Sequence, residues 1–235
     1  MTPIGFSTGC LHKAGMQANE AVRLYHCIGA DAIELSFASS AELDAFSLTT
    51  TATKTLEQYK YVSIHAPWKA RYDSSSYKTL DKLRYLYETT SASGIVLHPA
   101  NDVDFQMIDR QGLPFLIENM DSRKKFGTTP EDFRKLAEDY RFGFVLDLQH
   151  AYEHDPSMTL AMELINAMGD RLKHMHVSGC TEMENHVPVH MAKNAENITK
   201  ILDQHKNIPK ILEGELPRYV DMMMRELAYT RSFER

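Results

Sequence analysis

Eight short apolar runs, separated by helix-like segments, are the feature that most limits what this chain of 235 residues can fold into. Each run is rich in aliphatic or β-branched residues and is bounded by turn residues such as Gly94, Pro114 and Gly143, a pattern typical of buried strands. We predict strands at Ile4–Ser7, Ala32–Leu35, Val62–His65, Ile95–His98, Phe115–Glu118, Phe144–Asp147, Leu172–Val177 and Lys210–Glu213.

These strand–helix units extend over residues 1–235 with no linker or low-complexity tract between them. Eight such units favour closure into a barrel, and the chain length suits one closed α/β core. An open doubly wound sheet is the alternative, but it usually carries a Gly-rich phosphate loop after its first strand, which Ser7-Thr8-Gly9-Cys10-Leu11 does not provide. We therefore predict one α/β domain over residues 1–235, a (β/α)8 TIM barrel.

Charge and cysteine content limit the partners and the compartment. The net charge of −6 gives no support to DNA as a partner through a broad basic surface, although a local patch beside bound cations can hold phosphates. Cys10, Cys27 and Cys180 are too far apart to indicate a disulfide framework, which favours a reducing compartment. No signal peptide or long apolar span is evident, so we expect a cytoplasmic protein without membrane contact. The oligomeric state stays open.

Residues that can bind a metal ion stand at or near the end of seven predicted strands. They are Glu34, His65, His98, Glu118, Asp147, His176 and Glu213, at intervals of about 30 residues, the length of a βα repeat. In a barrel the C-terminal strand ends converge on one mouth. Unpaired carboxylates would repel one another there, and divalent cations remove that repulsion. Carboxylates and imidazoles together suit Zn first, with Mn, Fe, Co or Mg as alternatives.

A single acid or imidazole at a strand end is weak evidence for a metal site. Glu34 alone is explained equally well as a buried core group, because its strand can extend to Leu35 or Ser36. The combination of four residues in matching positions is much harder to explain as coincidence. These four are Glu118, Asp147, His176 and Glu213.

Further candidate ligands lie beside these strand ends. His150 follows Asp147 by one helical turn, and Glu184 and His186 lie two residues apart after the seventh strand, on one face if the segment is extended. We expect His174 to orient His176 rather than to bind metal. The other histidines, His12, His26, His154, His190 and His205, are expected on the surface or on helices.

Several strand-end motifs match a known family in order along the whole chain. They are His65-Ala66-Pro67-Trp68, His98-Pro99, Ile117-Glu118-Asn119, Leu146-Asp147-Leu148-Gln149-His150-Ala151-Tyr152 and Met175-His176-Val177. With these motifs the chain resembles the endonuclease IV and xylose-isomerase-like TIM-barrel superfamily (AP endonuclease family 2), most closely its endonuclease IV branch.

The resemblance implies a site of up to three metal ions. Glu118 would bridge two ions, one held also by His65 and His98 and the other by Asp147, His176 and Glu213. His150 and His186 would hold a third ion, with the longer Glu184 where the family usually has Asp. The family's Gly-Glu-Gly is replaced by Val189-His190-Met191.

Two enzyme functions follow as hypotheses. The first is a metal-dependent hydrolase that attacks a phosphoester through a dinuclear or trinuclear site, with Lys69, Arg71, Arg123, Lys124 and Lys125 as candidate cations near the mouth and Trp68 as a stacking surface. The alternative is a sugar isomerase or epimerase, in which one metal and the catalytic pair Glu118 and Glu213 move a proton. The expected substrate is a small phosphorylated or sugar molecule. A non-catalytic metal-binding protein ranks last.

Overall fold

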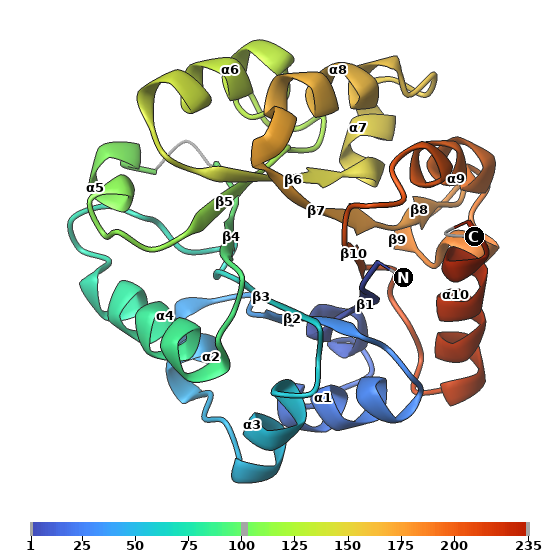
Figure 1. The fold of residues 1–235 in the computed structure, drawn as a ribbon, viewed down its shortest axis with the longest axis horizontal. Coiled ribbons are helices and arrows are strands. Elements are labelled where there is room, and N and C mark those ends of the chain that lie inside the picture. Colours follow the sequence, from blue (N-terminus) through green and yellow to red (C-terminus); the bar gives the residue numbers. More distant parts are fainter. Residues whose placement is uncertain (1, 100–102, 234–235) are drawn as a thin grey trace.

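The computed structural model describes residues 2–99 and 103–233, and its centre is a closed barrel of eight parallel strands with helices around the outside (Figure 1). The order around the barrel is β1, β10, β7, β6, β5, β4, β3 and β2. The barrel strands are β1 (Ile4–Ser7), β2 (Ala32–Ser36), β3 (Tyr61–His65), β4 (Ile95–Leu97), β5 (Phe115–Glu118), β6 (Gly143–Asp147), β7 (Leu172–Val177) and β10 (Lys210–Leu212). This is the predicted (β/α)8 TIM barrel.

Each barrel strand lies where the sequence pattern predicts one, with either end shifted by one residue at most. Two shifts concern candidate ligands, because β4 ends at Leu97 and β10 ends at Leu212. His98 and Glu213 are therefore the first residues after their strands, and they still stand at the C-terminal mouth of the barrel.

Helices follow the strands in chain order and form the outer layer. They are α1 (Ala18–Cys27), α2 (Ser40–Ala45), α3 (Thr50–Leu56), α4 (Tyr77–Thr90), α5 (Phe105–Asp109), α6 (Pro130–Asp139), α7 (Leu148–His154), α8 (Thr159–Met168), α9 (Ala195–Gln204) and α10 (Val220–Ser232). The start of α6 shows the local chemistry: Thr129 accepts a hydrogen bond from the Asp132 amide, Asp132 accepts one in return, and Pro130 occupies the first turn.

Strand alternation separates two kinds of buried side chain. Residues that point outward, such as Ile33, Ile64 and Leu146, join the large apolar core between barrel and helices. Among the inward-pointing residues, Val96, Leu116 and Val145 form a small separate apolar cluster. The rest of the described lumen is notably polar, with Glu34, Ser63, Glu118, Asp147, His174 and His176 all buried.

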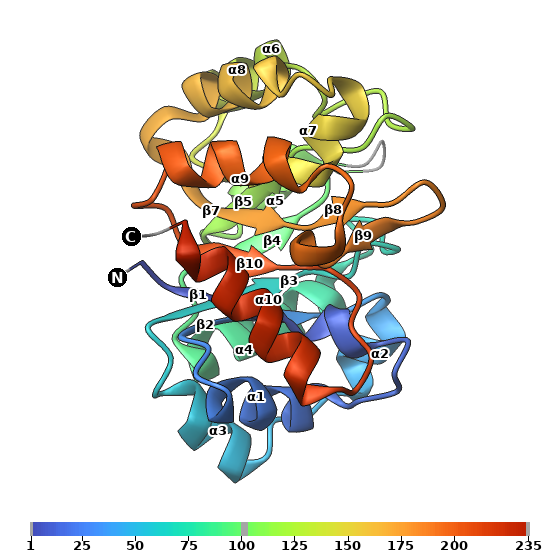
Figure 2. The same ribbon diagram turned by 90° about the vertical axis from the view of Figure 1, so that its right-hand side faces the viewer.

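A short hairpin interrupts the regular alternation after β7. Its strands, β8 (Gly179–Cys180) and β9 (Asn185–Val187), pair antiparallel outside the barrel sheet, and no pattern in the sequence predicted them. Figure 2 shows the hairpin projecting from one end of the barrel and the chain termini near the opposite end. Within the described ranges, no helix has the length and apolar character needed to cross a membrane.

Candidate metal centre

The C-terminal ends of the strands bring six predicted ligands to one place. His65, Glu118 and Asp147 are the last residues of β3, β5 and β6, and His176 is the last but one of β7. Parallel pairing aligns neighbours, so that Asp147 stands beside His176. His98 and Glu213 complete the set from the residues just after β4 and β10. The strand geometry therefore assembles side chains that span most of the sequence.

Glu118 occupies the centre of this group, and its two carboxylate oxygens face different partners. Oε2 lies 3.1 Å from Nε2 of His65 and 3.1 Å from Nε2 of His98. Oε1 lies 3.2 Å from Nδ1 of His176 and 3.6 Å from Nδ1 of His150. Glu118 is buried, and this one carboxylate joins two sets of imidazoles.

Asp147 is held by its backbone and by one oxygen of its side chain. Oδ1 accepts a hydrogen bond from the His150 amide at 2.8 Å and so caps the start of α7. The Asn119 side chain bonds the backbone of Asp147 on both sides, accepting from its amide at 2.6 Å and donating to its carbonyl at 2.9 Å. The other oxygen, Oδ2, is buried and has no hydrogen-bond partner among the described residues.

Two sets of these side chains meet the distance requirement for holding a cation, because their ligand atoms lie within 4.8 Å of one another. One set is His65, His98 and Glu118, and the other is Glu118, Asp147, His176 and Glu213. A third set, Glu34, His65 and His176, lies deeper in the lumen. Imidazole and carboxylate donors suit divalent transition metals, and the partnerless Oδ2 of Asp147 is a buried anionic atom that a cation would satisfy. The residues therefore fit a metal centre.

Two predicted ligands of a third ion lie together, and one lies apart. The rings of His150 and His186 stand 5.4 Å apart between centroids in an edge-to-face arrangement, and both line the mouth cavity. His186 has a left-handed backbone with φ of 53°, and its Nδ1 is 3.1 Å from the Ser178 hydroxyl. Glu184 is exposed in the β8–β9 turn and is not among the cavity-lining residues.

The pKa values of Glu118 and Glu213 shift in opposite directions. Burial alone would raise the pKa of Glu118, but the neighbouring His176 and His98 outweigh that effect and hold its pKa well below 4.5. For Glu213, burial dominates, and the charges of Glu118 and Glu34 add to it against the opposing effect of His176, so its pKa rises to about 8. Without a cation, the centre therefore reduces its negative charge by protonating Glu213.

The histidines likewise separate into two classes. Burial alone would lower the pKa of His65. Its hydrogen bond to Glu118 and the charge of Glu118 outweigh burial and raise the pKa to about 9. The carboxylates also raise the pKa of His176 well above 6.5 against the effect of burial. Burial lowers the pKa of His98 and of His186 below 6.5, so these two imidazoles are neutral and ready to bind a cation.

A cavity of about 500 Å³ opens above the centre. His65, His98, Glu118, His150, His186 and Glu213 line it, while Asp147 and His176 are not among its lining residues. Trp68 also lines the cavity, with its ring 5.8 Å from the ring of His65 and perpendicular to it. The volume suits a small molecule or one residue of a larger one.

Several positively charged side chains line this cavity, and two of them are paired with carboxylates. Lys69, Arg123 and Lys124 line it as expected from the sequence, together with Lys13. Arg123 is held by Asp121 through two hydrogen bonds of 2.8 and 3.0 Å, and Lys13 pairs with Glu215. Arg71 and Lys125 are not among the lining residues.

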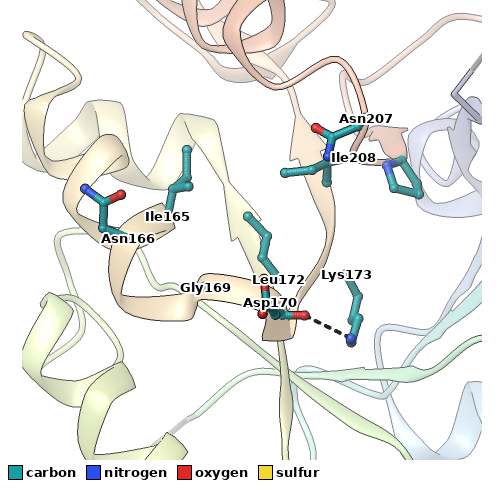
Figure 3. Close-up of a pocket in the computed structure, with 9 residues that line it drawn as sticks. Ile165, Asn166, Gly169, Asp170, Leu172, Lys173, Asn207 and Ile208 are labelled. Atoms are coloured by element: carbon teal, nitrogen blue, oxygen red, sulfur yellow. Dashed lines mark hydrogen bonds between the residues drawn. The ribbon is translucent and has the colours of Figure 1, made fainter.

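A second depression, of about 560 Å³, lies at the N-terminal ends of β7 and β10, away from all of these residues (Figure 3). Its lining includes Asn166, Asp170, Lys173 and Asn207. The hydrogen bond drawn there joins the Lys173 ammonium to the Asp170 carbonyl at 3.1 Å. Its described lining contains no imidazole and only one carboxylate, so the chemistry of the barrel is concentrated at the mouth.

Three roles became evident only in the structure. Glu34 lies two residues before the end of β2 and points into the lumen below the mouth, where it contacts His174 and His176. Asn119 fixes Asp147, although no sequence pattern assigned it a role. His12 is exposed, as expected, but it also lines the cavity and pairs with Glu42 at 2.6 Å. One feature of the sequence indicates a role for Asn119, namely that it directly follows Glu118 at a strand end.

Solved structures of similar architecture cover several chemistries. Endonuclease IV from Thermus thermophilus superimposes with a TM-score of 0.74 at 17% identity, over 98% of each chain. A D-tagatose 3-epimerase-like protein gives 0.71 at 16% identity, over 100% of this chain and 98% of the other. The probable 3-DHS dehydratase AsbF from Bacillus anthracis gives 0.69 at 14% identity, over 98% and 99%. At these identities the likeness establishes the fold alone.

Sequence comparison gives the family. No curated protein sequence matches the chain significantly. The profile of the family described as xylose isomerase-like TIM barrel matches residues 41–233, which include every ligand that the resemblance implies. The endonuclease IV branch is not singled out, because epimerases stand beside it among the similar structures. This chain belongs to the xylose isomerase-like TIM-barrel family.

Proposed function

We propose that this protein is a metal-dependent hydrolase that cleaves a phosphoester at a dinuclear or trinuclear site, in the manner expected of the endonuclease IV branch, and that Glu118 would help to hold two of the ions. The observation that carries the proposal is the position of Glu118 between two ligand sets. One of its oxygens faces His65 and His98 at 3.1 Å, and the other faces His176 at 3.2 Å. One-metal chemistry has no need of the first pair.

Each ligand set has its own residues besides Glu118. His65 and His98 would hold one ion, and Asp147, His176 and Glu213 would hold the other. When bound, such ions would supply Lewis-acid neutralisation of phosphate oxygens and would activate water near neutral pH. His150 and His186, with Glu184 as a further predicted ligand, are the candidates for a third ion. Zn is the first choice for this donor set, with Mn, Fe, Co or Mg as alternatives.

The protein's own side chains would bind and orient the substrate. Lys69 and Lys124 line the cavity, and each would attract an anionic phosphate to the mouth. Arg123 is fixed by Asp121, so its guanidinium would be placed before the substrate arrives, which lowers the ordering cost. Trp68 offers a flat apolar face for a sugar or base beside His65.

A sugar isomerase or epimerase is the second candidate, and one observation favours it. Glu118 Oε1 and Glu213 Oε2 both stand close to Nδ1 of His176, at 3.2 and 3.3 Å. The set of Glu118, Asp147, His176 and Glu213 would hold a single ion. Glu118 and Glu213 would then stand on opposite faces of the substrate and move the proton. Sugar epimerases among the structural neighbours support this alternative.

The number of metal ions per chain tests the two candidates against each other. The protein is purified without chelator or metal-affinity resin, and its metals are measured by elemental analysis. Two or three equivalents, mainly Zn or Fe, support the hydrolase and direct assays to small phosphoesters and abasic-site DNA. One equivalent of Mn, Mg or Co favours the isomerase and directs assays to a panel of sugars. No bound metal after loading would overturn both.

A further inference from the structure

The lumen directly below the candidate metal centre contains a buried polar network. Glu34 of β2 accepts a hydrogen bond from the Ser63 hydroxyl of β3 at 2.8 Å. Its carboxylate also lies 3.4 Å from Nε2 of His174 and 3.3 Å from Nε2 of His176. At the far side, the Tyr61 hydroxyl lies 2.8 Å from Nδ1 of His174. Glu34, His174 and His176 are each 0% exposed.

A charge buried this deeply is costly unless it is paired and hydrogen-bonded. An apolar side chain could fill the space, as it does in the neighbouring part of the lumen, where Val96, Leu116 and Val145 pack together. The polar network instead converges on His176, which both Glu34 and His174 contact. This position points to a role toward that residue rather than toward packing.

The two ring nitrogens of His176 face different groups. Nδ1 faces two other predicted ligands, since it lies 3.2 Å from Glu118 and 3.3 Å from Glu213, and it is the nitrogen that would bind an ion held with them. Nε2 points down the lumen to Glu34 at 3.3 Å and to Nε2 of His174 at 3.1 Å. An imidazole nitrogen that binds a metal carries no proton, so the proton of a neutral His176 must then lie on Nε2.

Two arrangements of the hydrogens in this network place that proton on Nε2. A third, in which His174 donates from Nε2 to Nε2 of His176, places it on Nδ1 toward Glu118 and would block the ion. In the first, His176 and His174 each donate from Nε2 to Glu34, and the Tyr61 hydroxyl donates to Nδ1 of His174. In the second, His176 donates to Nε2 of His174, and Nδ1 of His174 donates to Tyr61. An ionised carboxylate only accepts, so Glu34 favours the proton on the nitrogen that faces it.

We propose that Glu34, assisted by His174, is a positioning residue that holds His176 in the Nε2–H tautomer and leaves Nδ1 available to the metal ion. The inference rests on the metal centre of the proposed function and deepens it. Glu34 has the positioning role because its Oε2 accepts from Ser63 and faces both imidazoles. Its Oε1 has no hydrogen-bond partner among the described residues, and Glu34, His65 and His176 also meet the distance requirement for a cation, so the test below includes a ligand role for Glu34 as the contrary outcome. Its contribution is to raise the affinity of the site that contains Asp147, His176 and Glu213.

Metal affinity and stoichiometry of Glu34 variants test the proposal. Wild type, Glu34→Gln and Glu34→Ala are loaded with Zn, and their affinities are measured by competition with a chromophoric chelator. Glu34→Ala should weaken binding about 10- to 100-fold, the usual cost of losing an outer partner of a ligand, with an unchanged number of ions at saturation. Glu34→Gln keeps an acceptor and should lose less. Glu163→Gln, on the exposed face of α8, is the matched control.

The outcomes that would overturn the positioning role differ from the outcome that would overturn the proposed function. Loss of one metal equivalent in Glu34→Gln would make Glu34 a ligand and overturn the positioning role. Unchanged affinity in Glu34→Ala would also overturn it, while leaving the proposed function intact. Failure of wild type itself to bind metal would instead defeat the proposed function.

A measurement on the wild-type protein avoids any folding defect of the variants. NMR of the Zn-loaded, ¹⁵N-histidine-labelled chain reports which nitrogen of each imidazole carries the proton. The proposal requires His176 to be protonated at Nε2 and to bind the ion through Nδ1. A proton on Nδ1 of His176 would overturn it.

Discussion

Asn119 and Asp147 are joined by two hydrogen bonds, in which the Asn119 side chain bonds both the backbone amide and the backbone carbonyl of Asp147. The Asp147 amide donates to the Asn119 carboxamide oxygen at 2.6 Å, and the Asn119 amide group donates to the Asp147 carbonyl at 2.9 Å. Asn119 directly follows Glu118, so the pair ties the end of β5 to the end of β6. The relationship fixes two ligand-bearing strands relative to each other without contacting the predicted ion.

Replacing Asn119 should therefore weaken both the fold and metal binding. Asn119→Ala leaves a buried amide and a buried carbonyl without partners, and we expect the free energy of unfolding to fall by about 2–3 kcal/mol. Urea denaturation of the metal-free protein measures this loss. Asn166→Ala, at an exposed position on α8, is the control and should change stability little. Equal stability of the two variants would contradict the role given to Asn119.

Glu118→Gln should abolish turnover in either proposed reaction while sparing the fold. The amide has nearly the same shape but lacks the charge that both ligand sets share, so metal content should fall in both sets. The loss of activity should exceed the about 10- to 100-fold loss that is typical when a residue hydrogen-bonded to a metal ligand is replaced. Elemental analysis, a substrate assay and a thermal melt measure the three effects. A variant that turns over normally would refute the shared basis of both mechanisms.

His186→Ala separates the two candidate functions. It should remove one metal equivalent and most of the activity from a trinuclear hydrolase, but it should affect a one-metal isomerase only slightly. Glu184→Gln tests the remaining predicted ligand of that third ion from its exposed position in the β8–β9 turn. Retention of three equivalents by His186→Ala would show that this histidine is not a ligand.

The cations at the mouth should act on substrate binding alone. Lys69→Gln and Lys124→Gln remove charges that line the cavity but that belong to neither ligand set. For an anionic substrate we expect KM to rise several-fold, more strongly at low salt, with kcat and metal content nearly unchanged. Lys125→Gln, just outside the cavity lining, is the neighbouring control. An unchanged KM in Lys69→Gln and Lys124→Gln, or a salt-independent KM in wild type, would argue against a phosphorylated substrate.

Stability of the metal-free protein should decrease as the pH rises from about 6.5 to about 9. The pKa of His65 is raised from 6.5 to about 9, so its contribution is complete below 6.5 and is lost as pH rises through 9. The pKa of Glu213 is raised from 4.5 to about 8, and protonation of this carboxyl favours the folded state with the same sign.

Thermal melts across this pH range, with a chelator and with saturating Zn, check the expectation. Tm should fall by several degrees with the chelator. Zn should flatten or reverse the trend, because cations bind the deprotonated ligands. A chelated protein whose Tm stays level between these pH values would show that His65 and Glu213 do not titrate as described.

The sequence by itself determined the barrel and the positions of most of its candidate ligands. Short runs such as Phe115–Glu118 are apolar until their last residue, and this local pattern survives folding because strand alternation and burial obey short-range rules. Six of the predicted ligands are consequently found where strand ends converge. The two-residue periodicity also put His174 and His176 on the same face of β7, as expected from the sequence.

Only the tertiary structure decided which of these residues touch and through which atoms. His176 and Glu34 are 142 positions apart, and no local pattern could show that one ring nitrogen meets Glu34 while the other meets Glu118. The β8–β9 hairpin likewise turned Glu184 outward and His186 toward the cavity, although an extended segment would place both on one face. Side-chain direction across a closed barrel depends on the register of all eight strands, and that register is fixed only when the barrel closes.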